Sequence, residues 1–501
     1  MKLERSAGII LHPTSLPGPG GVGTLGNPAR SFVDRLAIAK QRWWQILPLN
    51  PPGHGGSPYS ATSAFAGNPI LLDPHDFVAR GWLTDADNKE FEAECEKFPH
   101  NRYEVDQVTT RKHRLLTTAA ENWRAEGGAK NKEFNAFCDE HDHRWLDDFA
   151  LYTALKDAHD GESWRAWPKE LVRRDDDALK KVRDELSDAI STVKFLQWQF
   201  FEQWAALREY AAKQGVTFLG DLPIFVAMDS ADAWANRRLF ALQEDGSAEA
   251  VAGVPPDYFS ETGQRWGNPL YDWDAVASEG YQWWIDRVQQ VCRTVDLVRV
   301  DHFRGFESYW RIPADEETAI NGRWEKGPGD EIFEAIREQL GAVPFIAEDL
   351  GIITDEVREL RDRQNLPGMK VLHFAFDGDP EHPFLPRNYP EHCVAYTGTH
   401  DNDTTMGWYH SIPEEERHRV RSYLSHPDKG ILGALIGALW KSRAAMTIIP
   451  AQDLFGLGSE FRMNRPGMAD ENWNWRMTWE ELNAEPIFQR LGQLTVDANR
   501  A

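Results

Sequence analysis

The chain has 501 residues, of which 41% are hydrophobic and 27% are charged, so it can bury a large core and does not have the composition of a disordered protein. Asp and Glu number 79 against 55 Lys and Arg, which gives a formal net charge of −24 at pH 7. A surface this acidic repels phosphate backbones and anionic lipids, so neither nucleic acid nor a membrane is expected as a partner.

The amino-terminal segment and the cysteines exclude further classes of protein. The apolar run near the start, AGIIL, is followed at once by His12 and Pro13, which fits neither a secretion signal nor a membrane span, so we expect a cytoplasmic protein. The cysteines are widely separated and form no metal-ligand pattern. We therefore expect no disulfide framework, no metal site and no cofactor.

Short apolar runs bounded by turn residues predict buried strands. In chain order, these runs cover residues 7–11, 42–49, 216–220, 296–300, 344–347, 370–376, 393–397 and 447–451. Stretches with helical spacing lie between most of them, such as residues 27–41, where Asn27 is expected as the N-cap and Pro28 as the first helical residue. Strands that alternate with helices indicate parallel βαβ units.

Polar side chains follow most of the predicted strands. They are His12, Asn50, Asp221, Asp301, Glu348 and Asp401. In a parallel barrel the carboxyl ends of all strands share one face, and that face builds the active site from residues far apart in sequence. An open doubly wound sheet would concentrate such residues at a single switch point. The sequence therefore predicts an α/β fold of the (β/α)8 TIM-barrel type.

Two connections are longer than a crossover requires. Residues 74–215 have the pattern of amphipathic helices and predict a mainly helical subdomain inserted after the second strand. The Gly- and Pro-rich stretch 253–273 predicts an ordered loop after the third strand. The expected organisation is a barrel start at 1–73, the helical insertion at 74–215 and the rest of the barrel at 216–501.

One motif suggests a different class of protein. Residues 21–26, GVGTLG, match the GxGxxG pattern of dinucleotide sites. Three prolines at positions 13, 17 and 19 separate the motif from the first strand, and the second strand ends in Asn50, where a ribose-binding acid is required. This context argues against a nicotinamide or flavin site.

Three strands are expected to bring carboxylates to one rim, at Asp301, at Glu348 with Asp349, and at Asp401 with Asp403. Arg299 stands two residues before Asp301, so both side chains point to the same side of the strand and the guanidinium can keep the carboxylate ionised. Crowded carboxylates repel, so at least one should have a raised pKa and stay protonated near neutral pH, as a general acid must. An ordinary ion pair and a metal site are the alternatives, and the absence of any ligand-loop spacing argues against the metal.

Nine stretches follow one another along the chain: LHPTSLPGPGGVG, WWQILPLNPPG, SPYSATSAFAGNP, GDLPIFVA, GVPPDYFSETGQRWGNPLY, RVDHFRGFE, IAEDLG, YTGTHDNDTT, and RMNRPG with NWNWR. Together they resemble the amylomaltases, also called 4-α-glucanotransferases or disproportionating enzymes, over nearly the whole chain. The resemblance is to the short members of the family, which lack the extra N-terminal domains of longer relatives.

The resemblance implies a role for each matching residue. Asp301 would be the covalent nucleophile, Glu348 the acid/base, and Asp401 a third acid that binds sugar hydroxyls and stabilises the transition state. The implied substrate contacts are Arg299, His400, Asp221, Ser57, Tyr59, Trp266, Tyr258, Phe259 and Asn472. Met468 departs from the small residue expected in the last motif, which weakens the assignment of Asn472.

The implied activity is transfer of α-1,4-glucan segments between maltooligosaccharides by a retaining double displacement, with glucose as acceptor or product. An α-glucan hydrolase of the same superfamily and a non-catalytic glucan-binding protein are the alternatives. Residue types do not separate transfer from hydrolysis, whereas the presence of all three acids counts against a binding protein.

Overall fold

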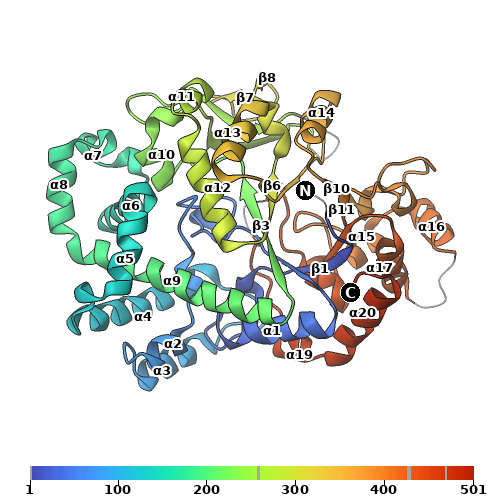
Figure 1. The fold of residues 1–501 in the computed structure, drawn as a ribbon, viewed down its shortest axis with the longest axis horizontal. Helices are drawn as coiled ribbons and strands as arrows, with labels where there is room; N and C mark the ends of the chain where they lie inside the picture. Colours follow the sequence, from blue (N-terminus) through green and yellow to red (C-terminus); the bar gives the residue numbers. More distant parts are fainter. Residues whose placement is uncertain (1–2, 257–259, 426–429, 469–470) are drawn as a thin grey trace.

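The computed structural model describes residues 3–256, 260–425, 430–468 and 471–501, and in these residues eight parallel strands form the centre of the fold (Figure 1). The strands are β1 (Ser6–Ile10), β2 (Trp43–Gln45), β3 (Thr217–Pro223), β6 (Leu297–Asp301), β9 (Phe345–Ala347), β10 (Gly368–Val371), β11 (Cys393–Tyr396) and β12 (Met446–Pro450). Each predicted run overlaps one of them. The sixth differs most, because the strand begins at Gly368 and residues 372–374 form a 3-10 turn.

The strands close into a barrel. Their order is β10-β11-β12-β1-β2-β3-β6-β9, with hydrogen-bonded neighbours throughout. The two ends meet where the Ala347 N–H donates to the carbonyl oxygen of Pro367, the residue before β10, at 2.9 Å. Strands such as β1 and β12 are buried along their whole length, which explains why they read as continuous apolar runs rather than as alternating ones. The prediction of a (β/α)8 barrel is confirmed.

A set of helices occupies the chain between β2 and β3. They are α2 (Pro74–Ala79), α3 (Asp85–Cys95), α4 (Val105–Ala125), α5 (Lys132–His141), α6 (Asp147–Ala158), α7 (Lys169–Arg173), α8 (Asp176–Glu185) and α9 (Ser187–Lys213). The long helix α9 buries Trp204, Leu207 and Ala211, whose spacing of three and four residues places them on one face. In Figure 1 most of these helices form the left side of the molecule.

The remaining helices mostly surround the barrel (Figure 1). They are α1 (Asn27–Ile38), α10 (Ala231–Ala235), α11 (Trp273–Ser278), α12 (Gln282–Thr294), α13 (Asp330–Leu340), α14 (Asp355–Arg363), α15 (Thr405–Ser411), α16 (Glu414–Tyr423), α17 (Ile431–Lys441), α18 (Ala451–Phe455), α19 (Trp479–Leu482) and α20 (Glu485–Asp497). The prediction for the start of α1 is wrong by one residue, because Gly26 is the N-cap and Asn27 is already helical. A side chain at position 26 would collide with Asp73, so the close approach requires glycine there. No helix among the described residues is long and apolar enough to cross a bilayer.

The stretch predicted as an ordered loop contains part of a second sheet. Within the described residues this sheet has the order β5-β4-β7-β8 and is antiparallel. Its strands are β4 (Ala250–Val254), β5 (Gln264–Pro269), β7 (Ser308–Pro313) and β8 (Arg323–Lys326). They are short, and the glycines and the proline in β4 and β5 hide the alternating pattern of a strand, so the sequence did not predict them.

One glycine of the barrel allows a direct test of the packing. Gly8 on β1 pairs with Trp43 on β2, and a Cβ atom on Gly8 would lie 2.5 Å from the Trp43 carbonyl oxygen. Because that oxygen belongs to the backbone of a neighbouring strand, it cannot move aside without disturbing the barrel. We expect Gly8→Ala to lower the free energy of unfolding by about 1–3 kcal/mol, seen as a lower thermal midpoint.

Gly437→Ala is the matched control for this substitution. It adds the same methyl group in helix α17, where nothing lies within 4 Å of the new atom. It should raise the stability by about 0.4–1 kcal/mol, because alanine restricts the unfolded chain and favours the helix. Equal shifts of the two thermal midpoints would contradict the packing of β1 on β2.

Candidate active site

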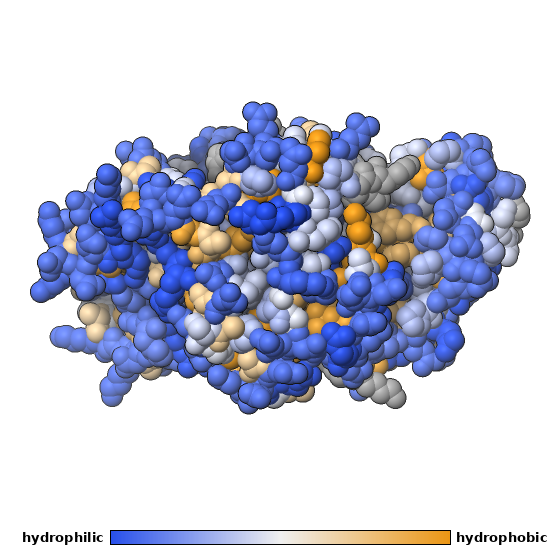
Figure 2. Space-filling view, turned by 90° about the horizontal axis from the view of Figure 1, so that it is seen from above, coloured by the Kyte–Doolittle hydropathy of each residue, from blue (hydrophilic) through white to orange (hydrophobic). Residues whose placement is uncertain are grey.

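A cleft of about 1470 Å³ opens where the barrel strands end. Of the predicted site residues, its wall contains Ser57, Tyr59, Trp266, Arg299, Asp301, Glu348, His400, Asp401 and Asn472. Tyr258 and Phe259, which were also predicted, lie outside the described residues. Figure 2 shows the top of the molecule, where hydrophobic residues gather near the middle of a largely hydrophilic face.

Arg299 on β6 bridges two carboxylates inside the barrel. Asp221 on β3 is its register partner, and Arg299 Nη1 lies 2.6 Å from Asp221 Oδ2. Arg299 Nη2 lies 2.8 Å from Asp301 Oδ1, on the same side of β6, as the two-residue period predicts. The side chain of Arg299 is only 4% exposed and that of Asp221 is fully buried. A buried charge of this kind is tolerated only when it is paired, so the bridge holds both carboxylates in place.

Asp301 and Glu348 occupy corresponding positions on neighbouring strands. β6 and β9 run parallel, with Val300 opposite Ala347, and the two acids are the next residue on each chain. Adjacent strands lie about 4.7–4.9 Å apart, so the register alone places the two acids side by side. The Glu348 N–H donates to the Val300 carbonyl oxygen at 3.1 Å, which extends the pairing to this level. Both side chains line the same cleft.

The backbone around the two acids holds the Glu348 carboxyl group. Its Oε2 accepts the N–H of His302 and its Oε1 accepts the N–H of Leu350, both at 2.9 Å. His302 has a φ of 51°, which is uncommon for a residue other than glycine. This turn comes directly after Asp301, and it points the His302 N–H at Glu348. Strained backbone of this kind concentrates at functional sites.

The surroundings raise the pKa of both acids. For Glu348, burial is the main cause and the charge of Asp301 adds to it, while Arg299 opposes them. For Asp301, burial again raises the pKa, Arg299 lowers it, and the charges of Asp221 and Asp401 raise it. The pKa of Glu348 is the higher of the two, so Glu348 keeps its proton while Asp301 ionises. This division suits Glu348 to the work of an acid and Asp301 to that of a nucleophile.

Asp401, which follows β11, has the opposite electrostatic environment. Burial alone would raise its pKa, but His400 and Asn464 outweigh burial and hold the pKa of Asp401 well below its usual range. His400 Nε2 lies 3.2 Å from Asp401 Oδ2, and Asn464 Nδ2 donates to Oδ1 at 2.6 Å. The Asp401 side chain remains 42% exposed to the cleft. Asp401 is therefore an anion in the same cleft as the protonated Glu348.

Tyr59 links the bridge below the cleft to the residues around Asp401. Its hydroxyl donates to Asp221 Oδ2 at 2.7 Å, and its ring stacks on His400 with centroids 5.0 Å apart. Trp473 packs against both rings. Ser57 accepts the Tyr59 N–H at 3.3 Å. Asp221, which was predicted as a substrate contact, has a fully buried side chain whose carboxylate binds the Tyr59 hydroxyl and Arg299.

Trp266 and Asn472, two other predicted substrate contacts, differ in how much of the side chain is available to a ligand. Trp266 on β5 is 39% exposed, and its ring stands at 84° to that of His302. The side-chain amide of Asn472 accepts the Arg465 N–H and donates to the Met468 carbonyl oxygen, both at 2.8 Å. Asn472 therefore shapes the turn at 465–468, while the exposed Met468 forms part of the cleft wall.

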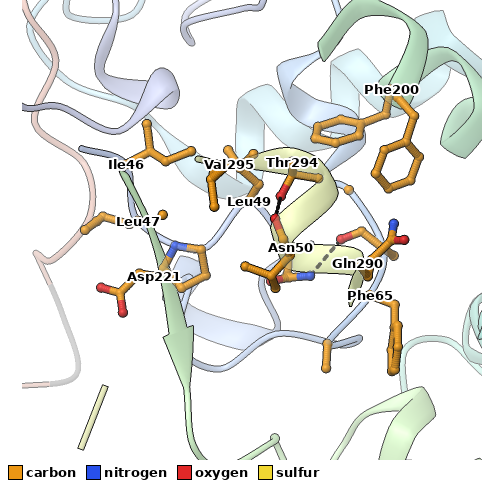
Figure 3. Close-up of a pocket in the computed structure, with 17 residues that line it drawn as sticks. Ile46, Leu47, Leu49, Asn50, Phe65, Phe200, Asp221, Gln290, Thr294 and Val295 are labelled. Carbon is orange, nitrogen blue, oxygen red and sulfur yellow. Dashed lines mark hydrogen bonds between the residues drawn. The ribbon is translucent and has the colours of Figure 1, made fainter. Parts of the chain in front are cut away.

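Two of the polar residues at strand ends point away from the cleft. Asn50 lines a separate cavity of about 40 Å³, where it lies among apolar side chains such as Phe200, and the carboxylate of Asp221 points away from them (Figure 3). The Asn50 amide donates to the Ala66 carbonyl oxygen at 2.9 Å. His12 lines another cavity, of about 20 Å³, next to His400. The sequence locates strand ends, but it does not show the direction of each side chain.

Asp349 and Asp403 are structural acids. Asp349 accepts the Met369 N–H at 2.7 Å and pairs with Arg361, which ties β9 to β10. Asp403 accepts the Ser459 hydroxyl at 2.7 Å. Within the described part of the chain, no group of three or more His, Cys, Asp or Glu could hold a metal ion.

Asn464 and Trp473 are site residues that the sequence reasoning missed. Asn464 lies in RMNRPG and Trp473 in NWNWR, two of the stretches that carry the family resemblance. The motifs were visible, but only the fold shows that these two side chains reach Asp401 and Tyr59.

Comparisons with known proteins agree with this geometry. The model of glycoside hydrolase family 77, described as 4-alpha-glucanotransferase, matches residues 11–482. The 4-alpha-glucanotransferase of Thermus thermophilus is 47% identical over 493 residues, which is 97% of each chain. That of Synechocystis sp. is 47% identical over 485 residues, which is 96% of this chain and 95% of the relative.

A solved structure extends the similarity to the fold. The amylomaltase from Streptococcus agalactiae, in complex with acarbose, matches with a TM-score of 0.95 and 36% identity, covering 99% of this chain and 100% of that one. Because the family model and these relatives span nearly the whole sequence, the chain belongs to glycoside hydrolase family 77, the 4-alpha-glucanotransferases.

Proposed function

We propose that the chain is a 4-α-glucanotransferase that moves segments of α-1,4-glucan between maltooligosaccharides with retention at the anomeric carbon. The observation that carries the proposal is the position of Asp301 and Glu348, one register step beyond Val300 and Ala347 on adjacent strands. Such neighbours suit the carboxyl separation of about 5–5.5 Å found in retaining enzymes, rather than the roughly 6.5–9.5 Å of inverting ones.

In the first step, Asp301 attacks the anomeric carbon of the donor. The bond from that carbon to the bridging 4-oxygen breaks, and Glu348 gives its proton to the departing oxygen. Arg299 binds Asp301 Oδ1 and keeps the carboxylate ionised, which leaves Oδ2 to attack. The raised pKa of Glu348 keeps its proton available. The product of this step is a β-linked glycosyl enzyme and a shortened glucan, or free glucose.

In the second step, the ionised Glu348 takes the proton of the 4-hydroxyl group of an incoming glucan. The hydroxyl oxygen attacks the anomeric carbon, the bond to Asp301 breaks, and an α-1,4 linkage forms again. Asp401 stays anionic throughout, so it can accept hydrogen bonds from sugar hydroxyls and stabilise the positive charge of the oxocarbenium-like transition state.

The size of the cleft supports transfer between two saccharides. Its volume of about 1470 Å³ exceeds the roughly 300–1,000 Å³ typical of a pocket for one small ligand. The glucan segment held on the enzyme and an incoming acceptor can therefore occupy the cleft together, and a sugar can reach the glycosyl enzyme in competition with water. The hydrolase alternative differs only in which nucleophile wins this competition.

Maltotriose distinguishes these functions. A transferase should convert it into glucose plus oligosaccharides longer than maltotriose, because each removed segment is passed to another sugar. A hydrolase should release only glucose and maltose, and a binding protein should leave it unchanged. Chromatographic sizing of the products over time measures the outcome, and the absence of any product longer than maltotriose would reject the proposal.

Asp301→Asn should abolish turnover while glucan binding persists, because the amide cannot form the glycosyl ester but leaves the cleft nearly unchanged in shape. Calorimetric titration with maltotriose measures the binding. Asp403→Asn is the matched control, since Asp403 is held by Ser459 behind the cleft. A variant Asp301→Asn that kept wild-type turnover would exclude Asp301 as the nucleophile.

The plot of kcat/KM against pH should be bell-shaped, with both limbs at higher pH than the pKa values of ordinary carboxylic acids would give. Activity requires ionised Asp301 and protonated Glu348, so it falls as the pH drops through the raised pKa of Asp301 and as the pH climbs through the raised pKa of Glu348. Glu348→Gln should cost about 10²–10⁴-fold in rate and remove the alkaline limb while the acid limb remains. An alkaline limb that survives in this variant would assign it to another group.

A further inference from the structure

Trp324 is an exposed tryptophan that none of the roles above uses. Across the residues described, the tryptophans with large exposed surfaces are Trp266, Trp324 and Trp479, whereas Trp44, Trp204 and Trp284, for example, are fully buried. Trp324 lies on β8, is 38% exposed, and forms part of the same cleft wall as Asp301 and Glu348. A second exposed apolar side chain, Ile352, lines the same cleft, and apolar surface that gathers in a groove is typical of ligand-binding sites.

The Trp324 ring is held in a fixed position. The guanidinium carbon of Arg304 lies 3.7 Å from the centre of the ring, so the cation covers one face of it. Trp310 meets the ring at 67° with centroids 5.1 Å apart. Arg304 is itself 5% exposed and donates to the Ile352 carbonyl oxygen and, at 3.2 Å, to the Ser308 hydroxyl. A rigid ring loses little conformational freedom when it stacks on a ligand.

The same arginine joins this ring to both catalytic segments. Arg304 follows Asp301 by three residues, and Ile352 follows Glu348 by four. Four residues span at most about 14 Å, so the Ile352 backbone lies within that distance of Glu348, and Arg304 separates the Ile352 backbone from the Trp324 ring. Ile352 is itself 47% exposed and lines the cleft beside Trp324, which adds apolar surface next to the ring. In Figure 1 the sheet that carries β8 lies at the top of the molecule, and in Figure 2 hydrophobic residues gather near the middle of that face.

We propose that Trp324, supported by Arg304 and flanked by Ile352, is a distal subsite that stacks on a glucose unit of a long α-1,4-glucan. The apolar face of a pyranose ring suits the flat indole, whose other face is occupied by the guanidinium. A short oligosaccharide bound at the carboxylates ends before the Trp324 ring, whereas a longer chain reaches it. The subsite therefore raises the affinity for long glucans selectively. This inference rests on the proposed function for its ligand class.

The test compares maltotriose with maltoheptaose. Trp324→Ala should raise KM for maltoheptaose by about 2- to 10-fold, the range expected for loss of one aromatic stack, with little change in KM for maltotriose or in kcat. Trp324→Phe should retain much of the preference for the longer glucan, because a flat ring remains above Arg304. Trp479→Ala removes a tryptophan that is 46% exposed on α19, outside the lining of the cleft, and should change neither KM.

A binding measurement separates this inference from the proposed function. Calorimetric titration of both saccharides into Asp301→Asn protein, with and without Trp324→Ala, reports affinity without turnover. A selective loss for maltoheptaose supports the subsite even if the wild-type protein fails to disproportionate maltotriose. Equal losses for both saccharides, or no loss for either, overturn the subsite even if the wild-type protein is an active transferase.

Discussion

The site depends on one buried cation, Arg299. Its guanidinium is desolvated inside the barrel, and it remains there because Asp221 and Asp301 both bind it. Asp221 also accepts the hydroxyl group of Tyr59, whose ring stacks on His400, the neighbour of Asp401. Asp301, Asp401 and the aromatic wall of the cleft are therefore connected through one ion bridge between two barrel strands.

The three acids have the same chemistry but receive different protonation states from their surroundings. Burial and the neighbouring Asp301 carboxylate raise the pKa of Glu348 against the opposing effects of Arg299 and the Leu350 N–H, so Glu348 holds a proton, while Asp401 is stabilised as an anion by His400 and Asn464. Asp301 lies between these limits, because burial opposes its ionisation and Arg299 favours it. The barrel produces these different protonation states because the three acids lie at the ends of three strands, where each carboxyl group has different hydrogen-bonding and charged neighbours.

The barrel could be predicted because its strands are buried on both faces and read as uninterrupted apolar runs. The acids at the strand ends could be predicted as well, because the end of each apolar run marks where its strand ends. The sequence could not show that Asn50 and Asp403 point away from the cleft, since both also follow strands and differ only in local backbone direction. It missed the β4–β5 hairpin, whose glycines blur the period of two. Asn464 was hidden because its contact with Asp401 spans more than sixty residues of sequence.

The antiparallel sheet has a consequence for how the molecule folds and opens. β4 precedes β6 in the chain and β7 follows it, so the pairing of β4 with β7 closes a loop from Val254 to Ser308 that includes β6. This loop is shorter than the one that the β1–β12 pairing closes, so closure entropy does not delay the sheet relative to the barrel. The strands β5 and β8 are more exposed than the barrel strands β1 and β12, so we expect the sheet to exchange its amide protons sooner, and the cleft wall that carries Trp266 and Trp324 to open locally while the barrel stays folded.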